Sequence, residues 1–442
     1  MGRTRGIKRI VERVDWMRFS RVLACGLALV GIAMGAVAGL ALDAPHTLHR
    51  SRLANQHLSV TSHSRIHHTV AHHPVSTTPA RHRSYKAGST HSGASLHSAS
   101  LRVHRHRYSE RFTASSFASG DIFADDITAG ENPVVRQAAI DALGGMNGTA
   151  VVIDPSNGRI LAMVNQKLAL SPGAEPCSTI KLSVALAALS EGIVTRETMV
   201  RLPGFRMNMT EALAHSNNLY FEELGRELGF DRVRHYATQF GLGELAGYHI
   251  PGEQLGVYPD QPLPPSEGGV GRMCSFGQGV SMTPLQLGAF VAAIANGGTL
   301  YYLQHPTSPM EIAGFEPHVK RTLDIAKLVP QLQDGMAGAV EYGTARRLRS
   351  NFQELPVFGK TGTCSDNGTR FGWFVSFSDT PQGSMVTVIF LEGGRPTFGP
   401  RAAELTGEFY KNLWDRNYFA DKGAPSAAGA SLVPASQPVQ QQ

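Results

Sequence analysis

Apolar and polar residues change period along this chain, and the changes separate strands from helices. Residues 149–164 hold two apolar runs on either side of the turn residues 155–158, which predicts a β-hairpin. Alternating positions return in residues 372–377 and 384–392, after the strand-like stretch that contains Lys360. These segments predict three consecutive antiparallel strands near the C-terminal end.

Between and after the strands, apolar residues recur at helical spacing. Residues 178–192 begin with Ser178 and end at a glycine, and residues 283–298 begin with Thr283 followed by Pro284, which are typical helix boundaries. Residues 402–417 predict a C-terminal amphipathic helix. The order is two strands, a long helical middle, three strands and a helix. Strands from both ends can share one sheet, so we expect an α+β fold with an inserted helical lobe.

An uncharged segment near the N-terminus predicts a membrane anchor. Residues 22–42 hold no charged side chain, and 21 residues suffice to span a bilayer core of about 30 Å. Seven Lys and Arg side chains precede it, so the positive-inside rule places residues 1–21 in the cytoplasm. A cleavable signal ending near residues 36–38 is the alternative, although its apolar region would be unusually long. Both interpretations export the rest of the chain.

The next region has the composition of a disordered linker, which we place at residues 43–119. Residues 44–109 contain no Asp or Glu and hold 13 of the 18 histidines. Such a segment buries too little apolar surface to offset its ordering entropy. Metal binding is the alternative for the paired histidines His67, His68, His72 and His73, but their irregular spacing favours a spacer. Residues 120–417 are then the folded domain, and residues 418–442 a disordered tail.

The distribution of charge excludes one class of partner. Residues 1–110 carry 16 Lys and Arg against four acidic residues, whereas the whole chain has a net charge of +6. The remainder is therefore net negative, by about six charges. The basic character belongs to the N-terminal arm, so we expect no nucleic-acid partner for the folded domain. Nothing in its sequence predicts a metal site or a cofactor.

Three of the four cysteines lie in the predicted domain, where they allow at most one internal disulfide. Cys177 and Cys364 each adjoin a candidate catalytic motif, so the two are expected to approach each other at the cleft. Small buried thiols are the usual state of such residues. We therefore expect Cys177, Cys274 and Cys364 to be free thiols.

The Gly-Lys-Thr of residues 359–361 raises the question of a phosphate-binding loop. Such a loop needs a glycine five positions earlier, where this chain has Glu354, and it leads into a helix. Strands follow here instead. The nucleotide interpretation fails, and Lys360 requires another role.

A serine and a lysine at the start of the first long helix suggest that role. Ser178 and Lys181 are three residues apart, which places both side chains on one helix face. A serine hydroxyl becomes a good nucleophile when a nearby base removes its proton, and a lysine of lowered pKa can do so. Desolvation and a second cation both lower the pKa of a lysine.

Two further motifs complete a catalytic set. Ser216 and Asn218 form a Ser-x-Asn sequence, and residues 360–363 read Lys-Thr-Gly-Thr, with hydroxyls at Thr361 and Thr363 and a glycine, Gly362, that lets a ligand backbone approach. Each motif alone is weak, because a serine at a helix start is usually only a cap. Together, in this order, they are the pattern of active-serine acyltransferases.

Residues of about 134–416 also resemble the transpeptidase domain of penicillin-binding proteins. The resemblance extends to "VVIDPSNGRILAMV", "LGFDRVRHYATQFGLGE", "FGQGVSMTPLQLGAFVAAIANGGTLY" and "YGTARRL". It implies a β-lactamase/transpeptidase-like fold, with an antiparallel five-stranded sheet flanked by helices. It also implies that Ser178 is acylated with Lys181 as its base, that Ser216 and Lys360 relay a proton to the leaving amine, and that Asn218 holds the donor peptide.

By the same resemblance, Thr361 and Thr363 bind the terminal carboxylate of the substrate. The backbone N–H groups of Ser178 and Thr363 form an oxyanion hole. The implied function is that of a single-pass inner-membrane D,D-transpeptidase or D,D-carboxypeptidase, with its domain on the periplasmic side. Peptidoglycan stem peptides are the implied substrates and β-lactam antibiotics the covalent inhibitors, and partners in a cell-wall complex are compatible with it.

Two other functions fit the same fold. A serine β-lactamase or β-lactam sensor requires a group that activates water, and the sequence around Glu253 lacks the asparagine that usually accompanies such a glutamate. A carboxylated Lys181 would be another route to hydrolysis. A catalytically inactive scaffold is a third alternative, which the intact motifs disfavour.

Overall fold

A computed structural model of the chain describes residues 113–420. The predicted cytoplasmic segment, the membrane anchor, most of the linker and most of the tail lie outside the described residues. Within residues 113–420, no helix is both long and apolar enough to cross a membrane. The whole predicted domain is described, so the candidate motifs can be placed.

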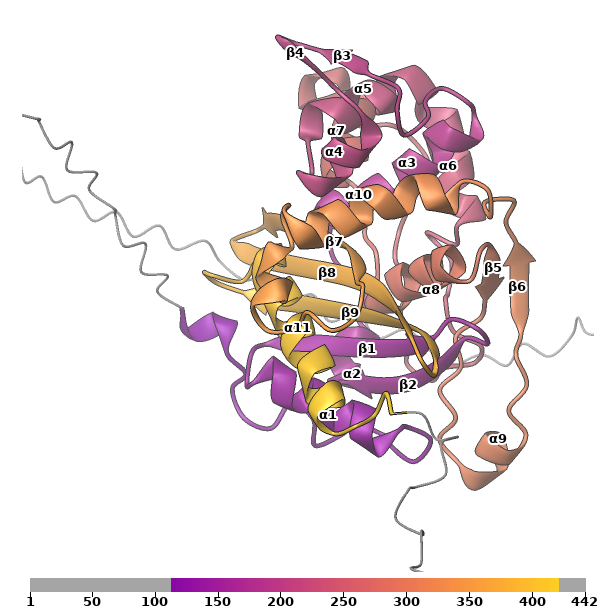
Figure 1. Ribbon diagram of the computed structural model, residues 1–442, viewed down its shortest axis with the longest axis vertical. Coiled ribbons are helices and arrows are strands. Elements are labelled where there is room, and N and C mark those ends of the chain that lie inside the picture. The colour runs from indigo at the N-terminus through magenta and orange to yellow at the C-terminus, as the bar shows by residue number, and fades with distance from the viewer. Residues whose placement is uncertain (1–112, 421–442) are drawn as a thin grey trace, which may run out of the picture. The chain divides into compact units, whose positions relative to one another are not determined.

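The centre of the fold is an antiparallel sheet of five strands (Figure 1). Its order is β2-β1-β9-β8-β7, so the hairpin from the start of the domain pairs with the three strands from its end. The strands are β1 (Gly148–Asp154), β2 (Arg159–Val164), β7 (Phe358–Asp366), β8 (Thr369–Thr380) and β9 (Gly383–Gly393). The predicted hairpin, the three later strands and their shared sheet are confirmed.

Alternate residues of the strands enter two separate cores. Val151 and Val388 face the core formed by the middle helices, whereas Val152 and Ile389 face the core beneath the terminal helices. The terminal helices α1 (Pro133–Leu143) and α11 (Gly399–Asp415) cover that second face (Figure 1). Both faces of the sheet are therefore buried, and successive side chains along each strand enter opposite cores.

The helical middle of the chain forms the inserted lobe, beyond the β7 edge of the sheet (Figure 1). The helices between β2 and β7 in the chain are α2 (Gln166–Ala169), α3 (Lys181–Ser190), α4 (Met209–Ala214), α5 (Asn218–Leu228), α6 (Phe230–Gln239), α7 (Gly269–Phe276), α8 (Pro284–Ala295), α9 (Pro309–Ala313) and α10 (Val329–Glu341). Short 3-10 helices are η1 (Ala114–Ser116), η2 (Cys177–Ile180), η3 (Pro265–Glu267) and η4 (Arg346–Ser350). Two small ribbons, β3 (Val200–Leu202) with β4 (Phe205–Met207) and β5 (Thr299–Tyr301) with β6 (Val319–Thr322), were not predicted.

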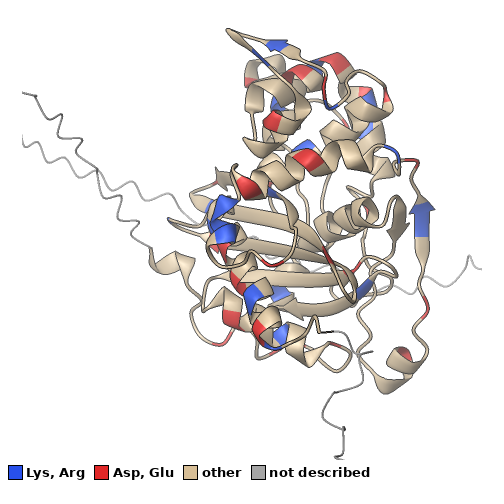
Figure 2. Cartoon of the chain, viewed as in Figure 1, with Lys and Arg blue, Asp and Glu red and all other residues tan. Residues whose placement is uncertain are grey.

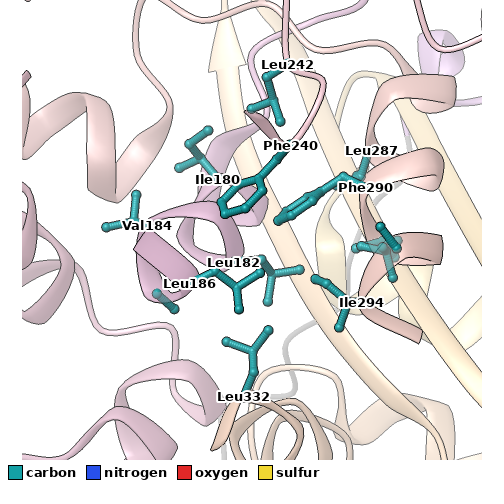
Figure 3. Close-up of a cluster of buried hydrophobic side chains, with 14 of the residues drawn as sticks. Ile180, Leu182, Val184, Leu186, Phe240, Leu242, Leu287, Phe290, Ile294 and Leu332 are labelled. Carbon is teal, nitrogen blue, oxygen red and sulfur yellow. The ribbon is translucent and has the colours of Figure 1, made fainter. Parts of the chain in front are cut away.

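Two helices are buried on all sides and join the lobe to the sheet. In α3 every residue from Lys181 to Leu189 is buried, and in α8 every residue from Pro284 to Ile294 is buried. Figure 3 shows Leu182 and Leu186 of α3 facing Phe290 of α8 across one apolar cluster. Burial of a leucine or phenylalanine side chain stabilises a fold by roughly 1.5–3 kcal/mol, so this cluster fixes α3 firmly.

The ends of the predicted helices follow their capping residues. Thr283 and Gln286 form a reciprocal capping box at the start of α8, as the Thr-Pro signal indicated. The helix expected from Ser178 is helical from Cys177, but its first turn is a 3-10 turn and the α-helix begins at Lys181.

The edges of the described region correct the expected domain limits. Residues 113–119 were placed in the linker, yet the backbone N–H of Thr113 donates to the carbonyl of Arg395 at 2.7 Å, and Ser116 is buried. At the other end Phe419 is buried beside Trp414. Isolated contacts of this kind leave no periodic signal in the sequence.

Charged residues lie mainly on the outer helices and the small ribbons (Figure 2). The sheet strands are largely uncharged along their middle, where Lys360 of β7 is the exception that matters for chemistry. A fully buried lysine is costly unless its environment neutralises it or pairs it.

Candidate active site

The candidate nucleophile lies in a short 3-10 turn that leads into a buried helix. Ser178 is the second residue of η2, and it is half-buried, whereas the neighbouring Cys177 and Thr179 are buried. In a 3-10 turn, side chains three residues apart nearly eclipse each other. Lys181 therefore lies directly beside Ser178, and its Nζ is 2.8 Å from the serine Oγ.

Lys181 is completely buried and surrounded by oxygen atoms. Its Nζ is 2.6 Å from Oδ1 of Asn218, 3.0 Å from the carbonyl oxygen of Ser216 and 3.1 Å from the Oγ of Ser216, in addition to its contact with Ser178. All these partners belong to uncharged groups. The ammonium form consequently has hydrogen bonds but no counter-ion in contact with it.

The turn that carries Ser216 connects two helices, each with an asparagine at its N-terminal cap. Asn208 caps α4, which ends at Ala214, and Asn217 caps α5, which begins at Asn218. Between them Ser216 has a φ of 54°, in the left-handed region that non-glycine residues seldom adopt. Such conformations occur at functional sites, where the surrounding structure determines them.

Lys360 reaches the same turn from the sheet. It is fully buried on β7, and its Nζ donates to the Oγ of Ser216 at 2.8 Å and to the carbonyl of Thr361 at 2.9 Å. The Ser216 hydroxyl thus lies between the amines of Lys181 and Lys360. The three motifs predicted from the sequence meet at this one hydroxyl.

Burial changes the protonation of both lysines. The pKa of Lys181 is well below its usual value of 10.5, mainly because the side chain is buried. The nearby charge of Lys360 lowers the pKa of Lys181 further. Burial also lowers the pKa of Lys360, to about 7. Burial therefore favours the neutral form of both amines relative to an exposed lysine, and a neutral amine is what a proton acceptor must be.

The two threonines of the β7 motif differ in exposure. Thr363 is exposed, and its Oγ1 accepts a hydrogen bond from the backbone N–H of Gly399 at 2.9 Å, which leaves the hydroxyl proton available. Thr361 is buried, and its Oγ1 lies 2.7 Å from the hydroxyl of Thr344. Thr344 lies within the quoted "YGTARRL" sequence, but we assigned it no role, because a lone threonine after a helix carries no recognisable signal.

Gly362 has a packing reason that the sequence did not indicate. A Cβ at this position would lie 2.9 Å from the carbonyl oxygen of Pro176 and 3.2 Å from a methyl of Thr179. Strand β7 and the Ser178 turn are therefore in direct contact at this glycine. The sequence predicts that the missing side chain makes room for a ligand, whereas a side chain here would point toward Pro176 and Thr179 of the protein itself.

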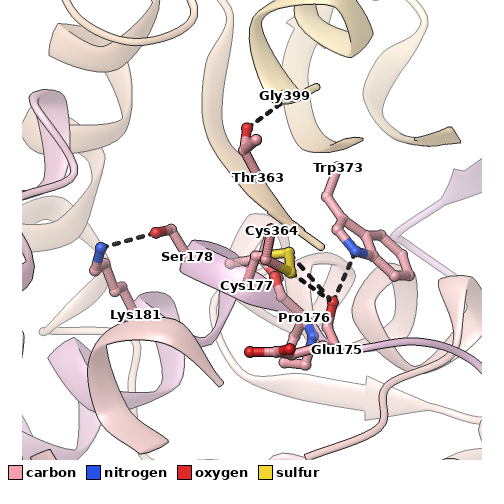
Figure 4. The surroundings of a disulfide bond; sticks show 10 residues. Glu175, Pro176, Cys177, Ser178, Lys181, Thr363, Cys364, Trp373 and Gly399 are labelled. Atoms are coloured by element: carbon pink, nitrogen blue, oxygen red, sulfur yellow. Dashed lines mark hydrogen bonds between the residues drawn. A yellow bond between two sulfur atoms is a disulfide. The ribbon is translucent and has the colours of Figure 1, made fainter. Parts of the chain in front are cut away.

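The expectation of free thiols was wrong for two of the three cysteines. Cys177 and Cys364 form a disulfide with their Cα atoms 5.5 Å apart, and Cys274 remains a buried thiol (Figure 4). A Cα separation of this size is typical of disulfides. The residues are 187 positions apart, so the pairing depends on the packing of β7 against η2, which the sequence alone did not show.

Lys181 and Lys360 thus meet at the Ser216 hydroxyl, and Ser178 and Asn218 contact Lys181. Glu253 does not join them. Both carboxylate oxygens of Glu253 accept backbone N–H groups, those of Ala246 and Gly247. In the described part of the chain, no carboxylate hydrogen-bonds to Ser178 or to either lysine of the site, and no group of His, Cys, Asp and Glu is placed to hold a metal ion.

Comparison with known proteins agrees with this arrangement. Residues 148–412 match the family described as the penicillin binding protein transpeptidase domain. Stage V sporulation protein D of Bacillus subtilis is 26% identical over 316 residues, which cover 60% of this chain and 48% of that protein. Peptidoglycan D,D-transpeptidase MrdA of Acinetobacter baumannii is 26% identical over 350 residues, with 61% and 51% covered. The chain thus matches about half the length of these relatives.

Solved structures show the same fold. A crystal structure of Pseudomonas aeruginosa PBP2 in complex with WCK 5153 aligns with a TM-score of 0.54 and 24% identity, covering 69% of this chain and 78% of that one. The family match extends over more than half of the chain and includes every residue of the three motifs. The chain therefore belongs to the family of the penicillin-binding protein transpeptidase domain.

Proposed function

We propose that this chain is an active-serine D,D-transpeptidase or D,D-carboxypeptidase, which acts on peptidoglycan stem peptides through an acyl-enzyme on Ser178. The observation that carries the proposal is the 2.8 Å contact between Lys181 Nζ and Ser178 Oγ at a fully buried lysine. Family membership and relatives that are named as D,D-transpeptidases support the reaction class.

Lys181 acts as the base because its surroundings direct its lone pair. A neutral amine has two N–H bonds and one lone pair. The carbonyl oxygen of Ser216 and the Oδ1 of Asn218 can only accept hydrogen bonds, so they take the two N–H groups. The lone pair then remains for the hydroxyl proton of Ser178. As this proton moves to Lys181, the Oγ attacks the carbonyl carbon of the terminal D-Ala-D-Ala bond.

The proton must next reach the leaving amine. Ser216 Oγ lies between the two lysines, 3.1 Å from Lys181 Nζ and 2.8 Å from Lys360 Nζ. A protonated Lys181 beside a protonated Lys360 is disfavoured in a buried site, so the pair favours one shared proton. Ser216 passes this proton to the departing nitrogen, with Lys360 as its second partner.

The other motif residues bind the substrate. Asn218 uses its Oδ1 on Lys181, which leaves its Nδ2 to hold the donor peptide backbone. Thr363 offers its free hydroxyl proton to the terminal carboxylate of the substrate, and the buried Thr361 is the second threonine that binds this carboxylate. The backbone N–H groups of Ser178 and Thr363 stabilise the oxyanion.

A serine β-lactamase or sensor is the second candidate, and it needs a water-activating group. Glu253, the glutamate considered for that role, has both oxygens bonded to backbone N–H groups. In a carboxylated Lys181 a carbamate would take the place of the amine, which now contacts four oxygen atoms. These contacts favour the D,D-peptidase.

The experiment that separates these functions is incubation with a fluorescent penicillin. The strained amide of the antibiotic resembles the D-Ala-D-Ala bond, so we expect one label per chain that persists for many minutes. Ser178→Ala should abolish the label, and labelling that survived this change would overturn the proposal. Rapid release with many turnovers would assign the chain to the β-lactamases.

We further propose that residues 22–42 anchor the enzyme in the inner membrane with residues 43–442 on the periplasmic side. The disulfide supports this placement, because disulfides persist in oxidising compartments. A reporter that is active only in the periplasm, fused after Gln442, should give a signal. Sequencing the mature N-terminus tests the anchor: a chain that begins near residue 39 would show cleavage.

A further inference from the structure

The disulfide joins the residues that flank the two walls of the candidate site. Cys177 directly precedes Ser178, and Cys364 directly follows Thr363 (Figure 4). One covalent bridge therefore links the proposed nucleophile to the strand that is proposed to bind the substrate carboxylate. None of the proposed catalytic steps uses this bridge.

The bridge holds a backbone conformation that is otherwise unfavourable. Cys177 is almost fully buried and has a φ of 52°, in the left-handed region. An L-residue other than glycine adopts this region at a cost and persists there only when its surroundings determine it. The disulfide is one such determinant, and it acts one residue before Ser178.

The groups around the bridge converge on a single carbonyl. The indole N–H of Trp373 donates to the carbonyl of Glu175 at 3.0 Å, and the sulfurs of Cys177 and Cys364 lie 3.4 and 3.7 Å from the same oxygen (Figure 4). A disulfide sulfur carries no hydrogen, so in the oxidised protein these two contacts are not hydrogen bonds. After reduction either thiol could donate to this oxygen, which gives the reduced state a hydrogen bond in place of the covalent tie.

We propose that the Cys177–Cys364 disulfide is a redox-dependent positioning element, and that the oxidised protein is the form competent for acylation. The inference rests on the proposed function. Cys177 and Cys364 are positioning residues: they act through Ser178 and Thr363. The bridge matters because the Ser178 Oγ must meet the carbonyl carbon of the substrate while β7 holds the substrate's terminal carboxylate. A displacement of about 1 Å between the two can cost on the order of 10² in rate.

Reduction of the bridge is an ordinary thiol–disulfide exchange. Cys364 is half-buried, whereas Cys177 is buried, so a thiolate of dithiothreitol attacks the Cys364 sulfur and releases the Cys177 thiolate. The second thiol of the reagent then closes its own ring and releases Cys364. The protein gains two electrons and two protons, and dithiothreitol becomes the cyclic disulfide.

The test measures acylation of the full chain by fluorescent penicillin in both redox states. Alkylation and intact-mass analysis define the state of the cysteines. The limiting rate, the label concentration at half that rate and the final labelled fraction are recorded separately. We expect reduction to lower the limiting rate by about 10- to 100-fold, with the final labelled fraction unchanged. Reoxidation with oxidised glutathione should restore the rate.

Three variants make the result specific. Cys364→Ser should be slow from the outset and insensitive to dithiothreitol. Cys177→Ala, which removes the other half of the bridge, should behave in the same way. Cys274→Ala, at the buried cysteine outside the bridge, should retain the oxidised rate and its sensitivity to the reductant.

The labelled fraction distinguishes positioning from folding. A bridge that only stabilised the fold would reduce the fraction labelled and leave the rate of the folded molecules unchanged, which would overturn the inference. Equal rates in the verified oxidised and reduced proteins would also overturn it while leaving the proposed function intact. Absence of labelling in every state would overturn the proposed function, and the inference with it.

Discussion

Lys360 and Ser216 are 144 residues apart in the chain, yet Lys360 Nζ donates to Ser216 Oγ at 2.8 Å. The same hydroxyl is 3.1 Å from the amine of Lys181. One small side chain therefore connects two buried lysines from different parts of the fold. Burial lowers the pKa of both lysines, and the charge of Lys360 lowers that of Lys181 further. The first two predictions concern these two amines.

Lys181 is expected to act as a base and not as a fixed charge. Lys181→Ala should slow acylation by penicillin by roughly 10²–10⁴-fold, the usual loss for a missing general base. Lys181→Arg retains the positive charge, but a guanidinium does not lose its proton at working pH, so this variant should be equally slow. Stopped-flow labelling gives the rates. An arginine variant close to the unaltered rate would refute the role of base.

Lys360 should make stability depend on pH. Burial lowers its pKa from 10.5 to about 7, so between these values the unfolded chain binds more protons than the folded one. The free energy of unfolding should consequently rise from about pH 7 to 10.5, with a contribution of at most about 1.4 kcal/mol per pH unit from this residue. Below pH 7 Lys360 is protonated in the folded chain as well, so the folded state carries the full cost of a buried charge and the stability contribution of this residue no longer changes with pH.

Lys360→Met is the matched variant for this prediction, since it keeps the apolar stem and removes the amine. Urea unfolding at several pH values should show a smaller slope for the variant over the range from 7 to 10.5. A remaining slope is expected from Lys181, whose pKa is lowered in the same direction. Identical slopes in the two proteins would contradict the prediction.

Thr344 should contribute to substrate binding through Thr361. Its hydroxyl lies 2.7 Å from the buried Oγ1 of Thr361, so Thr344→Val would leave that group without this partner. The loss of one such hydrogen bond is typically about 1 kcal/mol, so we expect about fivefold weaker binding of penicillin before acylation. Thr344→Ser keeps the hydroxyl and should bind almost normally. Equal affinities for the two variants would exclude this role.

The sequence predicted the architecture well because its signals are periodic and local. The hairpin at residues 149–164 and the helix capped by Thr283 follow from side-chain alternation and from capping chemistry that act over a few residues. The candidate residues were found because three short motifs each retain their own local pattern. That Ser216 and Lys360 act together was implied by the family resemblance, and in the structure the amines of Lys181 and Lys360 both contact the Ser216 hydroxyl.

Features that depend on contacts distant in sequence were missed. The Cys177–Cys364 pairing was anticipated as an approach but not as a bond, because a separation of 187 residues says nothing about distance in space. The contact of Thr344 with Thr361 was missed for the same reason. The small ribbons formed by three- and four-residue strands were missed for a different reason. Short strands have too few residues to show a period.

Gly362 provides a test of how closely β7 must lie against the Ser178 turn. Its φ is outside the left-handed region, so an alanine there meets neighbours without backbone strain. The added Cβ would be 2.9 Å from the carbonyl oxygen of Pro176, which is closer than real Cβ contacts allow. Either the strand or the turn must shift. We expect a loss of about 1–3 kcal/mol in the free energy of unfolding.

The disulfide makes this clash harder to relieve, because it holds the turn to the same strand two residues further on. Gly362→Ala should therefore slow acylation by on the order of 10²-fold, since the shift falls between Ser178 and the carboxylate-binding threonines. Ser365→Ala, on an exposed position of the same strand, is the control and should be near normal.

In Gly362→Ala/Cys364→Ser the strand is free to move away from the turn. The stability losses should then be less than additive, while the rate stays low. Strict additivity of the two losses would show that the bridge and the glycine act independently.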